Sequence, residues 1–191
     1  FPSLMFDGSG LPFEENVKLS KQAAEIAHSY GAAIEGELGM VGRDGVALDG
    51  EGAMTDPEDA RHFVEATGID SLAVGIGTAH GFYKKPPKLD FERLSAIDKA
   101  VDIPLVLHGG TGIPDKDIQR AISLGINKVN IGTLIHSTYL KTLKESLAKA
   151  GDNPYTIDVM EPAVLSVAEI VKEKIRLCRA SRSCCNAGNC A

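Results

Sequence analysis

The segment best suited to chemistry is an apolar run that ends on a histidine and continues into glycines. Residues 105–107 are apolar, His108 follows, and Gly109, Gly110 and Gly112 come next. A neutral imidazole binds metal ions, and glycines let backbone N–H groups approach a phosphate without a Cβ in the way. The segment therefore indicates a metal and a phosphate held in one site, which is typical of enzymes that act on phosphorylated substrates.

A second histidine and two carboxylates extend this pattern. His80 is also followed by a glycine, Gly81, and it precedes His108 by one strand–helix unit. We therefore expect the two imidazoles to follow neighbouring strands and to face the same opening. Glu35 and Glu37 lie two residues apart on one predicted strand, so their side chains point to the same face. Two carboxylates on a buried face require a metal or a basic partner.

Apolar runs alternate with stretches of helical period, which predicts five strand–helix units in succession. The predicted strands are Leu4–Phe6, Ala32–Leu38, Ser71–Val74, Pro104–His108 and Lys128–Ile131. The predicted helices are Phe13–Ser29, a helix capped by Thr55 that ends near Gly68, Phe91–Ala100, Pro114–Gly125, Thr133–Ala150 and Val164–Cys178. No hairpin signal interrupts them, so the pattern fits a TIM barrel or an open parallel sheet. Polar residues and glycines follow one strand after another, which favours the barrel.

Composition excludes several classes of protein. The chain has 191 residues, is 43% hydrophobic and carries a formal net charge of -6, which is typical of a globular domain. It has no basic stripe, so we expect no nucleic-acid partner and no anionic membrane partner. No apolar run reaches the length of a membrane span and the start does not resemble a signal peptide, so we expect a cytoplasmic protein. All four cysteines lie between Cys178 and Cys190, and we expect the tail, residues 179–191, to be disordered.

Six motifs in this order resemble the class II, zinc-dependent ketose-bisphosphate aldolases, in the fructose- and tagatose-bisphosphate branch. They are Phe1–Ser9, Leu11–Asn16, Glu35–Gly39, Gly77–Gly81, Val106–Pro114 and Lys128–Asn130. The resemblance runs from Phe1 to about Cys178. It implies an α/β fold, a (β/α)8 TIM barrel of which this chain carries roughly strands four to eight, with residues 1–178 forming the C-terminal part of one barrel domain.

The resemblance also implies an activity and a site. The family cleaves a ketose bisphosphate reversibly into dihydroxyacetone phosphate and an aldehyde, here glyceraldehyde 3-phosphate, and it forms homo-oligomers (dimers or tetramers). Zn2+ is the implied cofactor, with His80 and His108 as ligands and Glu37 as a supporting or alternative ligand. The residues implied to bind the substrate and its phosphate lie at strand ends: Gly81, Lys84, Gly109, Gly110, Thr111, Asn130, Ile131, Gly132 and Thr133.

The sequence departs from the family pattern in two respects. The Asp-His pair that supplies the family's proton-transfer carboxylate and its remaining zinc ligand does not occur in these 191 residues, so we expect this chain alone to be inactive. In the glycine loop where the family carries a base, Arg43 occupies part of the segment, and Asp44, Asp49 and Glu51 are carboxylates without a clear match. The catalytic residue is therefore not assigned.

Two other functions fit the same residues. One is a non-catalytic subunit that binds sugar phosphates, because the phosphate loops are present and the Asp-His strand is not. The other is a phosphate-binding barrel isomerase that uses Glu37 as base and needs no metal.

Overall fold

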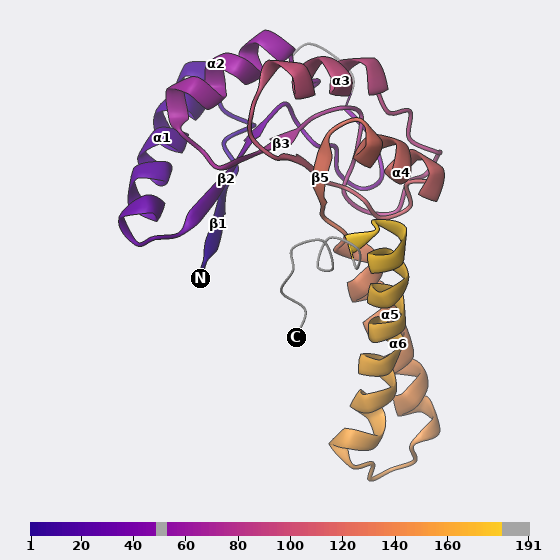
Figure 1. Ribbon diagram of the computed structural model, residues 1–191. Helices are drawn as coiled ribbons and strands as arrows, with labels where there is room; N and C mark the ends of the chain where they lie inside the picture. Colours follow the sequence, from indigo (N-terminus) through magenta and orange to yellow (C-terminus); the bar gives the residue numbers. More distant parts are fainter. Residues whose placement is uncertain (49–52, 181–191) are drawn as a thin grey trace, which may run out of the picture. The chain divides into compact units, whose positions relative to one another are not determined.

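The computed structural model describes residues 1–48 and 53–180 (Figure 1). Asp49, Glu51 and most of the cysteine-containing tail lie outside the described residues. Two compact units make up the chain, Phe1–Asn130 and Ile131–Ala191. The first contains one parallel sheet with strand order β1-β2-β3-β4-β5, which confirms the repeated strand–helix pattern and excludes hairpins from this sheet. Its strands are β1 Ser3–Phe6, β2 Ala33–Leu38, β3 Ser71–Val74, β4 Leu105–Leu107 and β5 Ile126–Val129.

Helices connect successive strands of this first unit. They are α1 Phe13–Ser29, α2 Pro57–Thr67, α3 Phe91–Ala100 and α4 Asp115–Ser123. In Figure 1, α1, α2 and α3 lie side by side along one face of the sheet, and α2 contacts both neighbours. Apolar residues at helical spacing face the sheet, and Phe63 of α2, Leu94 and Ile97 of α3 and Ile118 of α4 are almost fully buried.

Gly36 decides which way the polar residues of β2 point. A Cβ at Gly36 would lie 2.9 Å from Ile69 Cδ1 and 3.1 Å from the Phe63 ring, so this position faces the helix layer. Since side chains alternate along a strand, Glu35 and Glu37 face the opposite side of the sheet. They are 2% and 3% exposed, and their partners must therefore come from that face.

An irregularity in β5 turns a lysine toward these carboxylates. The register shifts between Leu105 and Val106, because Leu105 pairs with Ile126 whereas Val106 pairs with Lys128. The extra residue, Asn127, accepts the Leu105 N–H through its side-chain oxygen at 3.0 Å. Such a bulge re-aims the residues that follow it, and Lys128 thereby comes to lie on the same face as Glu35.

The prediction that Thr55 caps α2 was wrong. The N-cap of α2 is Asp56, whose side chain accepts the N–H groups of Glu58 and Asp59. Thr55 is instead buried, donating to the Leu38 carbonyl and accepting the Gly75 N–H, which ties the end of β2 to the end of β3. The prediction failed because tertiary contacts, and not helix capping, satisfy the Thr55 hydroxyl.

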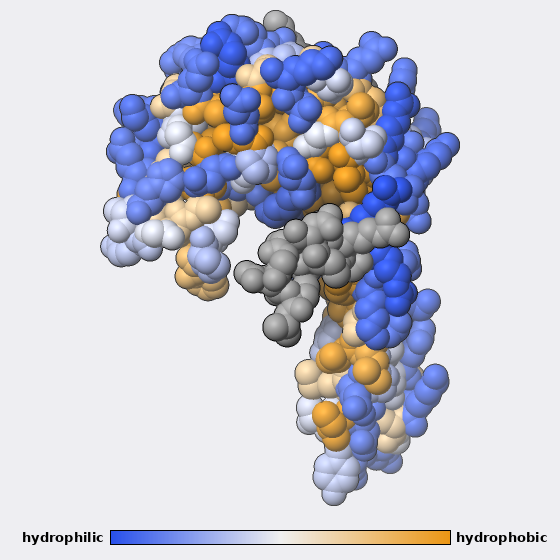
Figure 2. Space-filling model, viewed as in Figure 1, coloured by the Kyte–Doolittle hydropathy of each residue, from blue (hydrophilic) through white to orange (hydrophobic). Residues whose placement is uncertain are grey.

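The second unit is a pair of helices, α5 Thr133–Lys149 and α6 Thr156–Leu177, packed against each other. Helix α6 begins eight residues before its predicted start and continues through Pro162. A proline removes one N–H donor and bends a helix, and packing against α5 offsets that cost. Figure 2 shows apolar side chains on the surface of this pair; Leu140, Ile157 and Leu165 are each 59% to 64% exposed. No helix in the part of the chain that the structure describes is long and apolar enough to cross a membrane.

Candidate active site

His80 and His108 lie at the carboxyl ends of β3 and β4, as predicted. Their ring centroids are 5.9 Å apart and the rings are tilted by 39°. Partial burial of His80, together with the nearby charges of His108 and Arg43, lowers the pKa of His80 below its ordinary value. The neutral imidazole therefore predominates at neutral pH, and this is the form that binds a metal.

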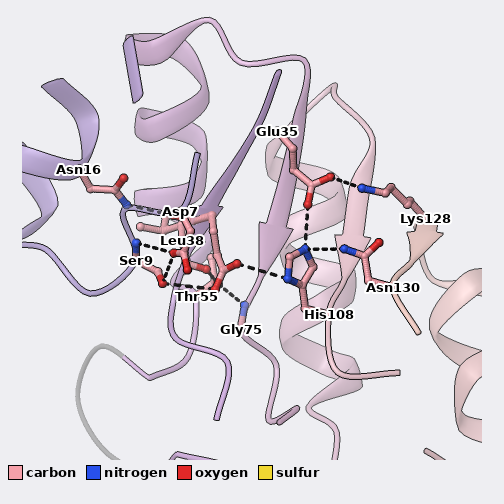
Figure 3. Close-up of polar contacts among 11 residues, drawn as sticks. Asp7, Ser9, Asn16, Glu35, Leu38, Thr55, Gly75, His108, Lys128 and Asn130 are labelled. Carbon is pink, nitrogen blue, oxygen red and sulfur yellow. Dashed lines mark hydrogen bonds and ion pairs between the residues drawn. The ribbon is translucent and has the colours of Figure 1, made fainter. Parts of the chain in front are cut away.

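Carboxylates flank both nitrogens of the buried His108 ring (Figure 3). His108 Nε2 lies 2.8 Å from Glu35 Oε1, and Glu35 Oε2 accepts a hydrogen bond from Lys128 Nζ at 2.6 Å. The amide of Asn130 lies 3.0 Å from the same His108 nitrogen. Burial raises the pKa of Glu35, but the hydrogen bonds to His108 and Lys128 outweigh it and hold the pKa below its ordinary value. The ionised Glu35 thus orients the imidazole and directs Nδ1 toward the other carboxylate.

Glu37 faces that second nitrogen, with its Oε2 3.4 Å from His108 Nδ1. Ser9 Oγ lies 3.2 Å from Glu37 Oε1 and 2.6 Å from Asp7 Oδ1. Asn16 Nδ2 donates to the Glu37 carbonyl at 3.0 Å, which fixes the end of β2. Burial, followed by the negative charge of Asp7, raises the pKa of Glu37 to about 7. Two crowded carboxylates beside an imidazole are typical of a site that a cation completes.

Tyr83 connects the loops that carry the two histidines. Its hydroxyl accepts the Ala79 N–H at 2.8 Å and donates to the Gly109 carbonyl at 3.0 Å. Gly109 has a φ of 70°, and a Cβ there would lie 2.4 Å from the Ala79 carbonyl oxygen. Only glycine allows this approach of the two backbones, so His80 and His108 are held at a fixed spacing.

The predicted substrate-binding residues fall into three groups. Gly81, Gly109, Gly110, Thr111 and Asn130 follow β3, β4 and β5 in the first unit. The Gly110 N–H donates to the Asn130 carbonyl at 3.0 Å, so this amide closes the turn. The Lys84 side chain is exposed. Ile131, Gly132 and Thr133 open the second unit, where the Gly132 carbonyl accepts the His136 N–H.

A cavity of about 720 Å³ lies beside the histidine and carboxylate cluster. Asp7, Glu37, Arg43 and His80 line it together with Ser9 and several apolar residues. Sequence reasoning did not assign Asp7, Ser9 or Tyr83 to the site. Asp7 and Ser9 follow β1, so their position at a strand end was an available signal, whereas the two contacts of the Tyr83 hydroxyl are visible only in three dimensions.

The donor set fits a metal in part. Two imidazoles and Glu37 are zinc ligands by type, and the contact between Glu35 and His108 is the kind of carboxylate support that metal-bound histidines have. Among residues 1–48 and 53–180, no three histidine, cysteine or acidic side chains converge closely enough to hold a metal ion.

The family model for class II fructose-bisphosphate aldolase matches residues 1–183. The chain belongs to this family. Among solved structures, it is similar to the YdjI aldolase of Escherichia coli K12, with 42% identity, a TM-score of 0.79 and coverage of 93% of this chain and 61% of that one. It is also similar to a protein from Coccidioides immitis assigned as a fructose-1,6-bisphosphate aldolase, at 34% identity, a TM-score of 0.82 and coverage of 93% and 62%.

A third similar structure is the fructose-bisphosphate aldolase of Campylobacter jejuni, at 26% identity, a TM-score of 0.74 and coverage of 94% of this chain and 61% of that one. The chain thus spans about three fifths of the length of these aldolases. Its five-stranded parallel sheet is part of the aldolase barrel, which confirms the predicted fold class.

Proposed function

We propose that this chain supplies the C-terminal part of a zinc-dependent active site that cleaves a ketose bisphosphate to dihydroxyacetone phosphate and an aldehyde, glyceraldehyde 3-phosphate. The observation that carries the proposal is the pair of histidines with ring centroids 5.9 Å apart, one of them set between two buried carboxylates. The intact protein, in this proposal, joins this chain to the upstream strands that the family's barrel requires.

His80 and His108 would hold the zinc ion, with Glu37 as a supporting or alternative ligand. Bound zinc supplies Lewis-acid stabilisation of negative charge on the substrate oxygens. Glu35 keeps the His108 ring oriented, and Lys128 keeps Glu35 ionised. The remaining ligand and the proton-transfer carboxylate would come from the upstream strands.

The phosphate would bind where glycine-rich backbone follows β3, β4 and β5. Gly81, Gly109 and Thr111 offer backbone and hydroxyl groups in the first unit, and Gly110 shapes the turn between them. Asn130, Ile131, Gly132 and Thr133 would complete the binding of dihydroxyacetone phosphate, with Lys84 contributing a positive charge.

The open edges of the sheet support a requirement for the missing strands. Within residues 1–48 and 53–180, β1 is an edge strand of the sheet, and its Leu4 and Met5 are 44% and 42% exposed. The α5–α6 pair also exposes apolar side chains, which would pack against a second copy in a homo-oligomer. We therefore expect the 191-residue chain alone to lack activity.

The experiment compares zinc content and aldol cleavage of the intact protein with those of His108→Ala. His62→Ala is the matched control, because His62 is exposed on α2. We expect about one zinc per chain in the wild type and the control, and loss of both zinc and cleavage in His108→Ala. Tight, equal zinc binding in His108→Ala would remove His108 from the metal site.

The same assay separates the other functions. Turnover that survives complete removal of metal would favour the isomerase that uses Glu37. Binding of dihydroxyacetone phosphate without any cleavage would favour the sugar-phosphate-binding subunit. Cleavage by this chain without its upstream part would contradict the predicted inactivity.

A further inference from the structure

The segment after β2 contains a tight turn whose shape follows from its sequence. Val46 N–H donates to the Arg43 carbonyl at 3.0 Å, and these two residues form an antiparallel bridge. The two residues between them, Asp44 and Gly45, both have positive φ values, 53° and 71°. This is the pattern of a type I′ turn, for which Asp-Gly is a preferred pair.

The turn is bonded to the backbone on both sides of His80. Gly42 N–H donates to the Thr78 carbonyl at 3.0 Å, and His80 N–H donates to the Gly42 carbonyl at 2.7 Å. Gly45 N–H in turn donates to the His80 carbonyl at 2.8 Å. The backbone of Arg43 is therefore fixed next to His80, and only the torsions of its exposed side chain remain free.

The Arg43 side chain reaches the cavity that His80, Glu37 and Asp7 also line. Among the residues that the structure describes, it is the only lysine or arginine side chain that lines this cavity, and it forms no ion pair or hydrogen bond with any of them. Its charge acts on His80, whose pKa it helps to lower after burial and His108. An arginine fixed at a wall that also carries carboxylates, yet not paired with them, is available for a ligand.

The order of the strands places Arg43 and the glycine turn at Gly109 on opposite sides of His80. Arg43 follows β2, His80 follows β3 and Gly109 follows β4, and these strands are neighbours in that order. A substrate with one anionic end at the Gly109 turn could thus extend past the histidines to the guanidinium.

We propose that Arg43 determines substrate specificity by binding an anionic group, a phosphate or a carboxylate, on the aldehyde half of the substrate. The inference rests on the proposed aldolase function. A guanidinium presents several N–H donors in a plane that fits a phosphate or carboxylate in a bidentate manner. Because the type I′ turn already fixes the Arg43 backbone, binding needs to order only its exposed side chain.

The test measures condensation of dihydroxyacetone phosphate with three aldehydes by the intact zinc-loaded protein. Glyceraldehyde is neutral, glyceraldehyde 3-phosphate carries a phosphate, and succinic semialdehyde carries a carboxylate. In Arg43→Gln, the ratio of kcat/KM for an anionic aldehyde to kcat/KM for glyceraldehyde should fall roughly 10- to 100-fold, the effect of losing hydrogen bonds to a charged group. The anionic aldehyde whose ratio falls identifies the group that Arg43 binds.

Two further variants control this result. Lys85→Gln removes a nearby exposed positive charge and should leave the ratio at its wild-type value. Arg43→Lys keeps the charge without the planar donors, so its kcat/KM ratio should lie between those of the wild type and Arg43→Gln. An unchanged ratio for both anionic aldehydes in Arg43→Gln overturns the proposal, as does an equal fall in Lys85→Gln.

Calorimetric titration with glycerol 3-phosphate gives a readout that needs no turnover. Two phosphate sites are expected in the wild type and one in Arg43→Gln. If the wild type binds glycerol 3-phosphate at two sites but cleaves no ketose bisphosphate, the aldolase function fails on its own. If the kcat/KM ratio for glyceraldehyde 3-phosphate falls in Arg43→Gln, equal stoichiometry in the wild type and Arg43→Gln overturns phosphate binding by Arg43.

Discussion

Removal of a single hydroxyl, in Tyr83→Phe, is predicted to weaken the connection between the two histidine loops. This hydroxyl accepts the Ala79 N–H at 2.8 Å and donates to the Gly109 carbonyl at 3.0 Å. The substitution keeps the aromatic ring and its packing. It therefore isolates the two hydrogen bonds that join the residue before His80 to the residue after His108.

The magnitude follows from what the substitution leaves behind. Ala79 is 0% exposed and Gly109 is buried, so water does not readily replace the lost partner. A buried polar group without a hydrogen bond costs about 1–3 kcal/mol. With one donor and one acceptor affected, the two penalties sum to about 2–6 kcal/mol, so we expect the free energy of unfolding to fall by at least about 2 kcal/mol. The spacing of the histidines should also become less defined, which lowers kcat.

Urea unfolding of the intact protein measures this change. The midpoint should fall with an unchanged m value, since the surface exposed on unfolding stays the same. Tyr30→Phe is the matched control, because Tyr30 is 86% exposed, and its free energy should lie within about 0.5 kcal/mol of wild type. If Tyr83→Phe and Tyr30→Phe had the same midpoint and the same kcat, the hydroxyl would not hold the loops.

Three further predictions test the local structure by urea unfolding. Thr55→Val should lower the free energy of unfolding by about 2 kcal/mol, because the Leu38 carbonyl and the Gly75 N–H lose their bonds to the Thr55 hydroxyl. Asp56→Ala should lower it by about 1 kcal/mol through loss of the N-cap of α2. The reverse order of the two effects would contradict this assignment of the two side chains. Gly109→Ala should lower the free energy of unfolding by about 2 kcal/mol or more, because Gly109 has a positive φ and a Cβ there would contact the Ala79 carbonyl. Gly10→Ala is the control and should be nearly neutral, because no atom lies within 4 Å of its Cβ position. Equal effects of the two substitutions would contradict the close approach of the two loops. Burial raises the pKa of Asp70, but hydrogen bonds from His28 and the Ile34 N–H hold this pKa below its ordinary value. The stability that ionised Asp70 contributes is therefore present above about pH 4 and is lost as the pH falls through the lower pKa of the folded state. Asp70→Asn should thus be less stable than wild type at pH 7 and converge with it in acid, and a difference that does not depend on pH would refute this.

Much of the fold could be predicted from the sequence because period and turn residues agree. Helix Phe13–Ser29, strand Ser71–Val74 and helix Phe91–Ala100 have the predicted bounds, and Gly68 ends α2 in the left-handed conformation. Strand ends were less accurate: β4 is Leu105–Leu107 and β5 is Ile126–Val129, because the bulge at Asn127 shifts the register there. No sequence pattern signals a bulge whose ladder bond is replaced by an asparagine side chain.

The site could be predicted only as far as strand ends define it. The placement of His80, His108 and the Glu35–Glu37 face follows from parallel strands, and the structure brings these groups together. The assignment of His80, His108 and Glu37 as zinc ligands, and of the glycines as a phosphate site, remains a prediction. Contacts such as Tyr83 with Ala79 and Gly109, or Lys128 with Glu35, depend on the positions of several strands and are not encoded in any local motif.

The orientation of the His108 ring depends on a backbone feature outside the cavity, the bulge at Asn127 in β5. The bulge at Asn127 brings Lys128 level with Val106 and within 2.6 Å of Glu35. With Lys128 as a partner, the buried Glu35 stays ionised in spite of its burial, and an ionised Glu35 orients His108. Glu37 has no lysine or arginine partner among the described residues, so burial, followed by the negative charge of Asp7, raises its pKa to about 7. Glu35 and Glu37, two positions apart on β2, thus have opposite pKa shifts. Glu35 supports the His108 imidazole, and Glu37 faces the cavity.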